Sequence, residues 1–295
     1  MQPLTRFYFG HHKCASQYIK TIMRQSAILM GWSVKVDGIA TLLPMDYHVR
    51  QPFADRILAK QEVLAKSAYD LICLENADND ALEIIEKNRS YRGFHVIRDP
   101  RDIVVSGYFS HRYSHPVSEH ESPWLWRYRA LLDSLPDQER GFLAEIDFCS
   151  TYFDRLRAWN YQNPQILEIR YETLIAKPTE TFAKIFRFLN VSVPVAALRP
   201  LVQFPLNVLS YKLGKQPLLK GAIMPVPLLQ WLIQRHAFER KSGGRTPGAE
   251  DLKHHYRKGI AGDWRNYFTP PVKDAFKKRY PGLVESLGYE ANEDW

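Results

Sequence analysis

A lysine and a hydroxyl lie close together where the first predicted strand gives way to a helix. An apolar run over 4–9 stops at Gly10, and apolar residues then recur at helical spacing over 19–30. The segment between them contains His11, His12, Lys13, Cys14, Ala15, Ser16 and Gln17. A helix beginning attracts anions because its first N–H groups lack partners and its dipole is positive there. We interpret this segment as an anion-binding loop. The alternative is a solvated lysine beside a serine that caps the helix.

This loop differs from the one that binds nucleoside triphosphates. That motif, Gly-x-x-x-x-Gly-Lys-Ser/Thr, needs a glycine directly before the lysine, and His12 stands there instead. The loop is therefore related in design to the triphosphate loop and is not identical to it.

A carboxylate follows a second compact apolar run. The run over 69–74 is typical of a strand buried in a parallel sheet, and Glu75 comes directly after it. In an open parallel sheet, residues just past the carboxyl end of a strand face the ligand crevice. Glu75 is thus a candidate for chemistry, and a solvated loop carboxylate is the alternative.

An arginine and a serine follow the next predicted strand. The strand ends at Arg98, Asp99 is a suitable N-cap, and Pro100 fits the first helical position. Ser106 then lies two turns into the helix. An arginine at a strand end and a hydroxyl on the adjoining helix can converge on one phosphate. The alternative is that Arg98 pairs with Asp99 or Asp102.

Two adjacent cations precede a glycine near the C-terminal end, at Arg257, Lys258 and Gly259. Such a sequence lets side chains and backbone N–H groups approach one anion closely. Asp263 is expected to cap a short helix that carries aromatic residues of 264–268 into the core. A basic solvated turn is the alternative.

Alternating strands and helices predict one α/β domain over 1–295 with a parallel sheet. Predicted strands are 33–36, 69–74, a run ending at 98, and 166–169; predicted helices are one ending near Gly31, then 52–66, 124–135, 141–159, 178–189 and 272–279.

In 198–238 the composition is apolar and prolines interrupt any long element. Core packing is favoured for this stretch over an acceptor lid, a dimer surface or an interfacial helix at 228–233.

The composition limits the classes of partner and compartment. Lysine and arginine number 40 against 32 acidic residues, a formal charge of +8 that favours an anionic ligand, a membrane surface or nucleic acid. Three cysteines without metal-ligand spacing indicate neither a disulfide framework nor a zinc site, and they fit a reducing compartment. The first strand begins close to Met1, and 198–238 is too broken to span a membrane. We therefore expect a cytoplasmic protein.

Taken together, three of these stretches resemble the sulfotransferases that use 3′-phosphoadenosine 5′-phosphosulfate (PAPS). The most specific is Arg257-Lys258-Gly259 followed by Gly262-Asp263-Trp264, which is similar to the C-terminal cofactor loop of the family. The stretch from Arg98 to Ser106 is similar to its 3′-phosphate site. The first loop is similar to the family's Pro-Lys-Ser-Gly-Thr-Thr-Trp: the lysine stays as Lys13, and the other positions hold His12, Cys14, Ala15, Ser16, Gln17 and Tyr18.

The resemblance implies a three-layer α/β/α fold with a central parallel sheet, as in P-loop nucleotide kinases. It implies in-line transfer of a sulfuryl group from PAPS to a hydroxyl or amine, leaving adenosine 3′,5′-bisphosphate (PAP), without a metal. Lys13 would hold the bridging oxygen. The whole loop 12–18, together with Lys258 and Gly259, would bind the cofactor; Arg98, Ser106 and Arg257 would grip the 3′-phosphate. Tyr171 falls where the family often contacts adenine.

The resemblance leaves the general base and the acceptor open. Many cytosolic members carry a histidine where this chain has Glu75, and other branches use a glutamate, so Glu75 is the first candidate. His111 and His115 are the alternatives. The acceptor is a small molecule, a lipid or a carbohydrate, with an apolar hydroxylated compound preferred because 198–238 is hydrophobic. No nucleic-acid partner is expected, peripheral membrane contact is left open, and the oligomeric state is not predicted. The rival classes are an ATP-dependent P-loop kinase and a non-catalytic binder of nucleic acid or membrane.

Overall fold

The computed structural model describes residues 3–35, 64–66, 68–120 and 122–295. The described chain forms two compact units: unit 1 contains the residues before 98 and 160–237, and unit 2 contains 98–159 and 238–295. The predicted helix over 52–66 is described only at 64–66, which are helical. The prediction of a single domain stays a prediction.

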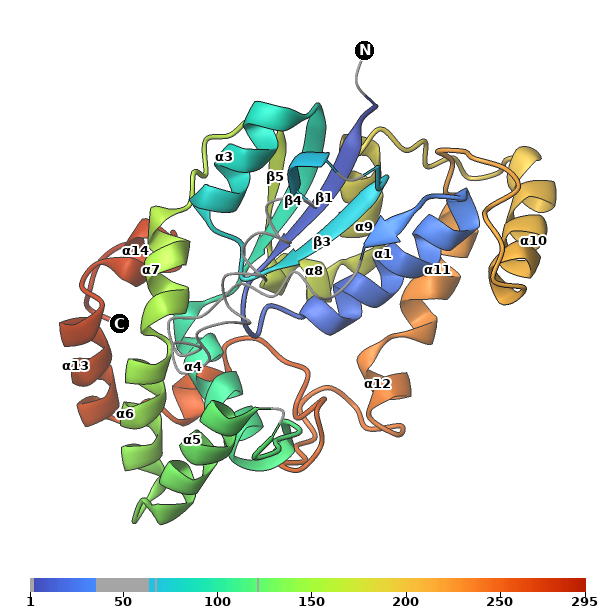
Figure 1. Cartoon of the computed structure of the whole chain (residues 1–295). Coiled ribbons are helices and arrows are strands. Elements are labelled where there is room, and N and C mark those ends of the chain that lie inside the picture. The colour runs from blue at the N-terminus through green and yellow to red at the C-terminus, as the bar shows by residue number, and fades with distance from the viewer. Residues whose placement is uncertain (1–2, 36–63, 67, 121) are drawn as a thin grey trace. The chain divides into compact units, whose positions relative to one another are not determined.

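Unit 1 is built on a parallel sheet of five strands (Figure 1). The strands are β1 (Thr5–Gly10), β2 (Val34–Lys35), β3 (Leu71–Glu75), β4 (Tyr91–Ile97) and β5 (Ile166–Arg170), in the order β2-β3-β1-β4-β5. Phe7, Tyr8 and Phe9 are consecutive and all fully buried, so both faces of β1 are covered. The chain continues from β1 to one side of the sheet and later crosses to the other. The loop after β1 therefore lies where the strand order reverses, which is the usual ligand position in such sheets.

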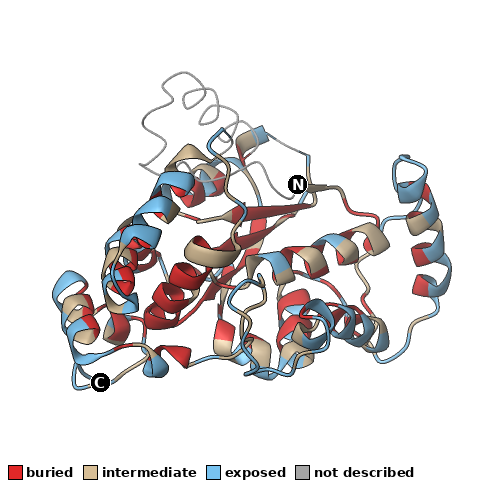
Figure 2. Cartoon of the chain, turned by 90° about the horizontal axis from the view of Figure 1, so that it is seen from below, coloured by how far each residue is buried: buried red, intermediate tan, exposed pale blue. Residues whose placement is uncertain are grey.

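Helices flank this sheet. Figure 1 shows α3 (Asn79–Asn88) on one side of the sheet, and α1 (Ser16–Met30), α8 (Tyr171–Ala176), α9 (Pro178–Phe188) and α11 (Val226–Arg235) on the other. The strands are the most continuously buried part of the unit (Figure 2). Helix α1 ends before Gly31, whose φ of 70° suits glycine at this position, as predicted. The three-layer α/β fold with a central parallel sheet is thus confirmed.

The prediction of core packing for 198–238 holds for α11, where Leu229, Leu232 and Ile233 are buried, and the prediction for this stretch was wrong in two respects for the helix before it. Prolines do not prevent a long element, since α10 (Arg199–Lys212) is a 14-residue helix with Pro205 inside it. Core packing is also wrong for this helix, because Leu201, Val202 and Leu209 are exposed. The physical reason is that buried side-chain hydrogen bonds hold α10, so it tolerates the one backbone bond that Pro205 removes.

Unit 2 is helical. Its elements are α4 (Pro100–Phe109), a π-helical turn over Ser110–Ser114, α5 (Pro123–Ser134), α6 (Gln138–Phe148), α7 (Ser150–Ala158), α12 (Phe238–Lys241), a 3₁₀ turn over Asp263–Asn266, α13 (Pro270–Arg279) and α14 (Leu283–Ser286). Helix α4 packs against α6, and α6 packs against α7 and α13. The single helix predicted over 141–159 is two helices, because the backbone at Cys149, with ψ of −2°, leaves helical geometry.

Two further properties bear on the sequence predictions. Cys14, Cys73 and Cys149 are all buried, and none of them forms a disulfide. Among the residues that the structure describes, no helix has both the length and the apolar character needed to cross a bilayer.

Candidate functional site

The loop between β1 and α1, residues 11–15, is shaped by two residues in left-handed backbone conformation. Lys13 and Ala15 each have φ of 60°. This region is costly for residues other than glycine, and such strain is characteristic of ligand-binding loops. Turns of this kind direct successive N–H groups into one concavity that suits an anion. The loop is named the β1 loop below.

The start of α1 is not capped by a side chain. Ala15 occupies the N-cap position and makes no capping hydrogen bond. Ser16 is the first helical residue: its hydroxyl donates to the carbonyl of His11 at 3.2 Å and accepts from the Tyr8 hydroxyl, also at 3.2 Å. Ser16 therefore braces the β1 loop and does not cap the helix. Burial raises the pKa of Tyr8 well above its ordinary value, and the hydroxyl stays available as a donor.

A buried histidine cluster in unit 1 supports the β1 loop. The rings of His11 and His95 meet edge to face at 4.7 Å, and His95 Nδ1 lies 2.6 Å from Glu168 Oε2. His95 and Glu168 are paired in register on β4 and β5. This cluster was not predicted from the sequence, because its partners come from three strands or strand ends that only the order of the sheet brings together.

Glu75, the first candidate for the general base, lies at the same sheet edge as the β1 loop. It is opposite Gly10 in the register of β1 and β3. Its Oε1 is 2.5 Å from the ammonium of Lys20, which is buried, whereas the Glu75 side chain is 35% exposed. Sequence reasoning missed Lys20, although a lysine on the apolar side of α1 was a visible signal of an internal ion pair. The pair fixes the carboxylate and leaves it accessible.

Two tyrosines predicted near the adenine also belong to unit 1. The ring of Tyr18 meets Phe182 of α9 edge to face at 5.8 Å. Tyr171 is buried at the start of α8, directly after β5. Their contact with a base stays a prediction.

In unit 2, the second and third sequence motifs lie side by side. Asp102 of α4 is buried and accepts hydrogen bonds from the backbone N–H groups of Gly262 at 2.7 Å and Trp264 at 2.9 Å. Arg98 Nη2 lies 3.5 Å from the carbonyl oxygen of Ile260. The Arg98 segment thus adjoins the loop over 257–262, named the C-terminal loop below (Figure 1). This convergence was predicted only through the resemblance.

The alternative partners of Arg98 are largely engaged elsewhere. Asp99 caps α4 as predicted, and its carboxylate receives two hydrogen bonds from the guanidinium of Arg101, at 2.9 and 2.8 Å. Arg101 is buried, reaches Glu290 at 2.7 Å and lies over the ring of Trp264. Asp102 Oδ2 lies 3.7 Å from Arg98 Nη2, so the alternative ion pair of Arg98 with Asp102 is present, as a long contact. Ser106 is half-buried on the same helix.

The two cations of the C-terminal loop are held by carboxylates. Arg257 Nη2 lies 2.5 Å and Lys258 Nζ 2.6 Å from Asp263, and Arg257 also contacts Glu250. Both basic side chains are mostly buried, so the solvated-turn alternative is excluded. Burial tends to raise the pKa of Asp263, but hydrogen bonds from Lys258, Arg257 and Asn266 outweigh it and hold that pKa below its ordinary value. Gly259, with φ of 68°, turns the chain after the cations.

Asp263 does not cap the short helix, so that prediction was wrong. Gly262, with φ of 76°, occupies the N-cap position of the 3₁₀ turn, and the Asp263 side chain points to the cations instead. Trp264 and Phe268 are buried, as predicted.

His111, the alternative base, is enclosed within unit 2. It lies in the π-helical turn, 2% exposed, with Nδ1 3.0 Å from Glu145 Oε2. Tyr128 donates to the same carboxylate oxygen at 2.9 Å, and burial followed by the Glu145 charge raises the pKa of Tyr128. His115 is nearer the surface, with Nδ1 2.8 Å from the carbonyl of Pro116. His111 is therefore a buried residue of unit 2.

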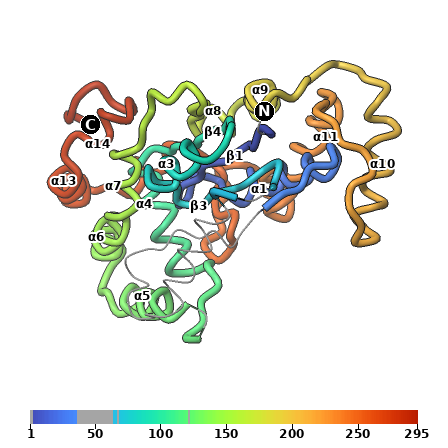
Figure 3. Tube along the Cα trace, turned by 45° about the horizontal axis from the view of Figure 1, so that its top comes forward, coloured from blue at the N-terminus to red at the C-terminus, as the bar shows by residue number. Residues whose placement is uncertain are grey.

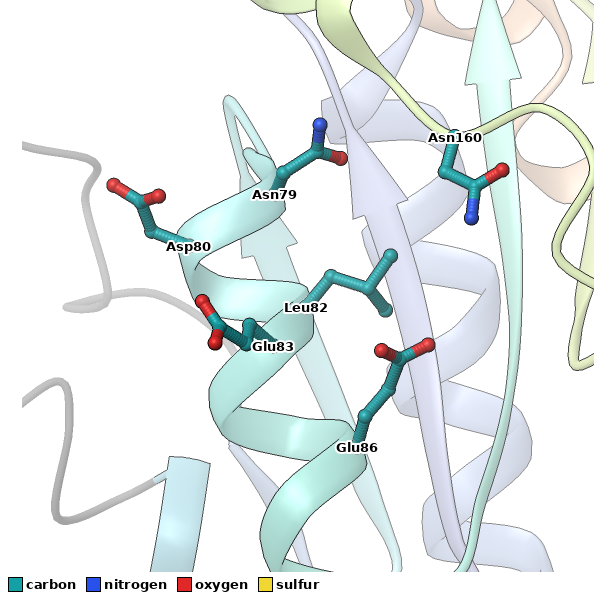
Figure 4. Close-up of a pocket in the computed structure, with 6 residues that line it drawn as sticks. All are labelled: Asn79, Asp80, Leu82, Glu83, Glu86 and Asn160. Carbon is teal, nitrogen blue, oxygen red and sulfur yellow. The ribbon is translucent and has the colours of Figure 1, made fainter.

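A shallow cavity of about 270 Å³ in unit 1 has the wrong charge for a nucleotide. It is lined by Asn79, Asp80, Leu82, Glu83, Glu86 and Asn160. Figure 4 shows Asn79, Leu82 and Glu86 pointing toward Asn160, while Asp80 and Glu83 point away from it. Carboxylates repel phosphate, so this cavity is not a candidate cofactor site.

Comparison with known proteins identifies the type of domain. A model of the sulfotransferase domain matches residues 83–204. A guinea pig (Cavia porcellus) 3-alpha-hydroxysteroid sulfotransferase is 27% identical, over 63% of this chain and 53% of its own length. Mouse sulfotransferase 2B1 is 29% identical over 63% of this chain and 46% of its own length. The match thus spans about half the length of these curated relatives.

A solved structure shares the fold. The crystal structure of a mouse sulfotransferase complexed with PAP superposes on 97% of this chain and 85% of its own, with a TM-score of 0.54 and 14% sequence identity. This similarity agrees with the parallel sheet and flanking helices described above.

Proposed function

We propose that this chain is a sulfotransferase that transfers a sulfuryl group from PAPS to a hydroxyl or amine of an acceptor, because residues 83–204 match the sulfotransferase domain and the similar curated proteins are sulfotransferases. PAPS, the donor, supplies the activated sulfuryl group. The acceptor forms a new bond to sulfur while the bond from sulfur to the bridging oxygen breaks and PAP leaves. The observation that carries this proposal is the pair of hydrogen bonds from Gly262 and Trp264 to Asp102, because they join the two phosphate-binding motifs in unit 2.

We assign the 5′ end of the donor to the β1 loop. Left-handed geometry at Lys13 and Ala15 and the uncapped start of α1 provide N–H groups for an anion. Lys13 would neutralise the charge that develops on the bridging oxygen, an interaction stronger in the transition state than in the ground state. His12, Cys14, Ser16, Gln17 and Tyr18 would complete this subsite.

We assign the 3′-phosphate to Arg98, Ser106 and Arg257, with Lys258 and Gly259 beside them. Arg98 is 7% exposed, so its guanidinium is shielded from water and would bind a phosphate more strongly than a solvated arginine. Arg257 and Lys258 are paired with Asp263, so a phosphate would share these cations with that carboxylate.

For the general base we favour Glu75 over His111. Glu75 is anchored by Lys20 and partly exposed, so an acceptor hydroxyl can reach it. His111 is enclosed by Glu145, Tyr128 and Phe148, which leaves little room for an acceptor. No metal takes part in this scheme.

For the acceptor we propose an apolar hydroxylated small molecule or lipid. The guinea pig relatives are named for 3-alpha- and 3-beta-hydroxysteroids, which are of this class. We also propose a cytoplasmic location, which fits three cysteines that form no disulfide. A kinase is not favoured, because His12 replaces the glycine that the triphosphate loop requires.

The proposal is tested by incubating the protein with PAPS labelled in the sulfur and a panel of hydroxysteroids, phenols and sugars. We expect label in at least one apolar hydroxyl compound, with stoichiometric release of PAP. Phosphoryl transfer from labelled ATP to the same panel, without sulfuryl transfer, would overturn it.

A further inference from the structure

Helix α10 buries three polar side chains beside Pro200 and Phe204, and it exposes most of its other apolar side chains. Gln203, Asn207 and Ser210 lie at spacings of four and three, on one face, and are at most 2% exposed. Leu198, Leu201, Val202, Pro205 and Leu209 occupy the opposite face; Leu201 is 70% and Val202 62% exposed. The hydrophobic effect alone would rotate this helix the other way.

Specific hydrogen bonds fix this orientation. The amide of Gln203 donates to the carbonyl of Met30 at 3.1 Å, and the amide of Asn207 donates to the carbonyl of Leu29 at 2.9 Å. These carbonyls lie at the C-terminal end of α1, where backbone acceptors need partners. The polar face of α10 thus completes α1, and the apolar face is held outward as a consequence.

The loop that follows α10 is tied to the same polar face. Asn207 Oδ1 accepts from the backbone N–H groups of Leu218 and Leu219 at 3.1 and 3.0 Å. Leu213 and Leu218 are each 61% exposed, so the loop adds to the apolar surface. The outer face of α10 with residues 213–219 is named the α10 surface below. In Figures 1 and 3, α10 lies at the margin of unit 1, beyond α1 and α11; Figure 2 shows its outer side exposed.

The α10 surface carries only positive charge. No aspartate or glutamate occurs between Glu180 and Glu239, whereas α10 and residues 213–219 contain Arg199, Lys212 and Lys215. Lys220, just past this surface, pairs with Asp70 at 2.8 Å. Lys212 and Lys215 are exposed, and Lys212 shares the outer face of the helix. An apolar stripe with basic residues beside it is the pattern of helices that lie in the interface of a bilayer.

We propose that the α10 surface docks on a lipid bilayer that contains anionic headgroups. The exposed leucines and Val202 enter the acyl boundary, and Lys212 and Lys215 contact headgroup phosphates. A second copy of the chain fits less well, because an isologous contact would bring the same lysines face to face without a carboxylate to pair them. The proposal stands apart from sulfuryl transfer, since no residue of the predicted donor site belongs to the α10 surface.

Vesicle flotation tests the proposal with the full chain. We expect the protein to float with vesicles of phosphatidylcholine mixed with phosphatidylserine, and not with phosphatidylcholine alone. The double variant Leu201→Glu, Leu209→Glu is expected to reduce binding at least about tenfold. The double variant Lys212→Ser, Lys215→Ser is expected to bind vesicles about fivefold more weakly for each lysine removed. Added salt is expected to weaken the binding of this variant less than that of wild type.

A matched control comes from unit 2. Leu131 of α5 is 49% exposed, close to Leu209 at 54%, so Leu131→Glu is expected to retain wild-type flotation. Circular dichroism and PAP titration of each variant separate lost docking from lost folding or a lost donor site.

Three results would overturn the proposal: no flotation of wild type, equal flotation with neutral vesicles, or equal losses in the Leu131 and Leu201/Leu209 variants. Light scattering, which measures the oligomeric state, can give a fourth result that would overturn the proposal. A dimer that dissociates in the Leu201/Leu209 variant would assign the surface to a second copy instead.

Discussion

The β1 loop and the C-terminal loop, the two anion sites proposed here, are built in opposite ways. The β1 loop relies on backbone geometry, with left-handed Lys13 and Ala15 leading into a helix start that no side chain caps. The C-terminal loop relies on side-chain charge, and its Arg257 and Lys258 already contact Asp263. The first site is organised for an anion in advance, whereas the second must divide its cations between a carboxylate and a ligand. Rate enhancement is therefore expected from the first and selectivity for the 3′-phosphate from the second.

The largest effect is expected from removing the base beside the β1 loop. Glu75→Gln should lower turnover about 10²–10⁴-fold, because proton transfer from the acceptor is lost, while PAP affinity stays within a few-fold of wild type. Steady-state transfer from labelled PAPS measures the first quantity and calorimetry the second. Glu83→Gln, on an exposed face of α3, is the control. If turnover stays near normal in Glu75→Gln and is lost in His111→Asn, the general base is His111 of unit 2 and not Glu75.

The next effect concerns the lysine of the β1 loop. Lys13→Met should reduce turnover about 10²–10³-fold, since the charge on the leaving oxygen loses its partner. PAP affinity should fall much less, because the backbone N–H groups remain. Lys87→Met, at an exposed lysine of α3, controls for a general loss of positive charge. A loss confined to PAP affinity, with unchanged turnover at saturation, would contradict the division of roles between the loops.

In the C-terminal loop the expected effect is on stability and its pH dependence. The pKa of Asp263 is held below its ordinary value in the folded chain, so its contribution to stability is present above the unfolded pKa, about 3.9, and is lost as pH falls through the folded value. Asp263→Asn should lower the free energy of unfolding at pH 7 by about 2 kcal/mol. Urea titrations should show wild type and variant converging below about pH 4. A difference that persists unchanged in acid would exclude the charge as its source.

The smallest effect isolates the backbone strain of the β1 loop. Ala15→Gly should raise the free energy of unfolding by about 0.5–1 kcal/mol, because glycine adopts a φ of 60° without the cost that alanine bears. Ala15→Val should lower it. Urea denaturation measures both variants. A destabilised glycine variant would show that Ala15 does not hold the left-handed conformation.

The sequence predicted those features that short-range patterns determine. Gly31 ends α1, Asp99 and Pro100 begin α4, and compact apolar runs become parallel strands, because each depends on neighbours within one or two turns. The three motifs of the proposed donor site were visible for the same reason. Their assignment to PAPS came from resemblance, since no local pattern distinguishes a 3′-phosphate from another anion.

What escaped prediction depends on partners distant in the sequence. Lys20 meets Glu75 across 55 positions, and Asp102 meets Gly262 across 160. The orientation of α10 depends on the carbonyls at the end of α1, so its apolar residues looked like core when read alone. Propensity and periodicity contain no information on such pairings, which follow from the order of the strands and the ends of the helices.

The most direct test of the account is a calorimetric comparison of PAP with adenosine 5′-monophosphate, in wild type and in Arg98→Ala. We expect wild type to prefer PAP by about 100-fold, since a buried arginine and a phosphate form strong charge-assisted hydrogen bonds. The preference should collapse in Arg98→Ala and persist in Arg127→Ala, an exposed arginine of α5. Equal affinity of wild type for the two nucleotides would contradict the assignment of the 3′-phosphate, and with it the proposed use of PAPS.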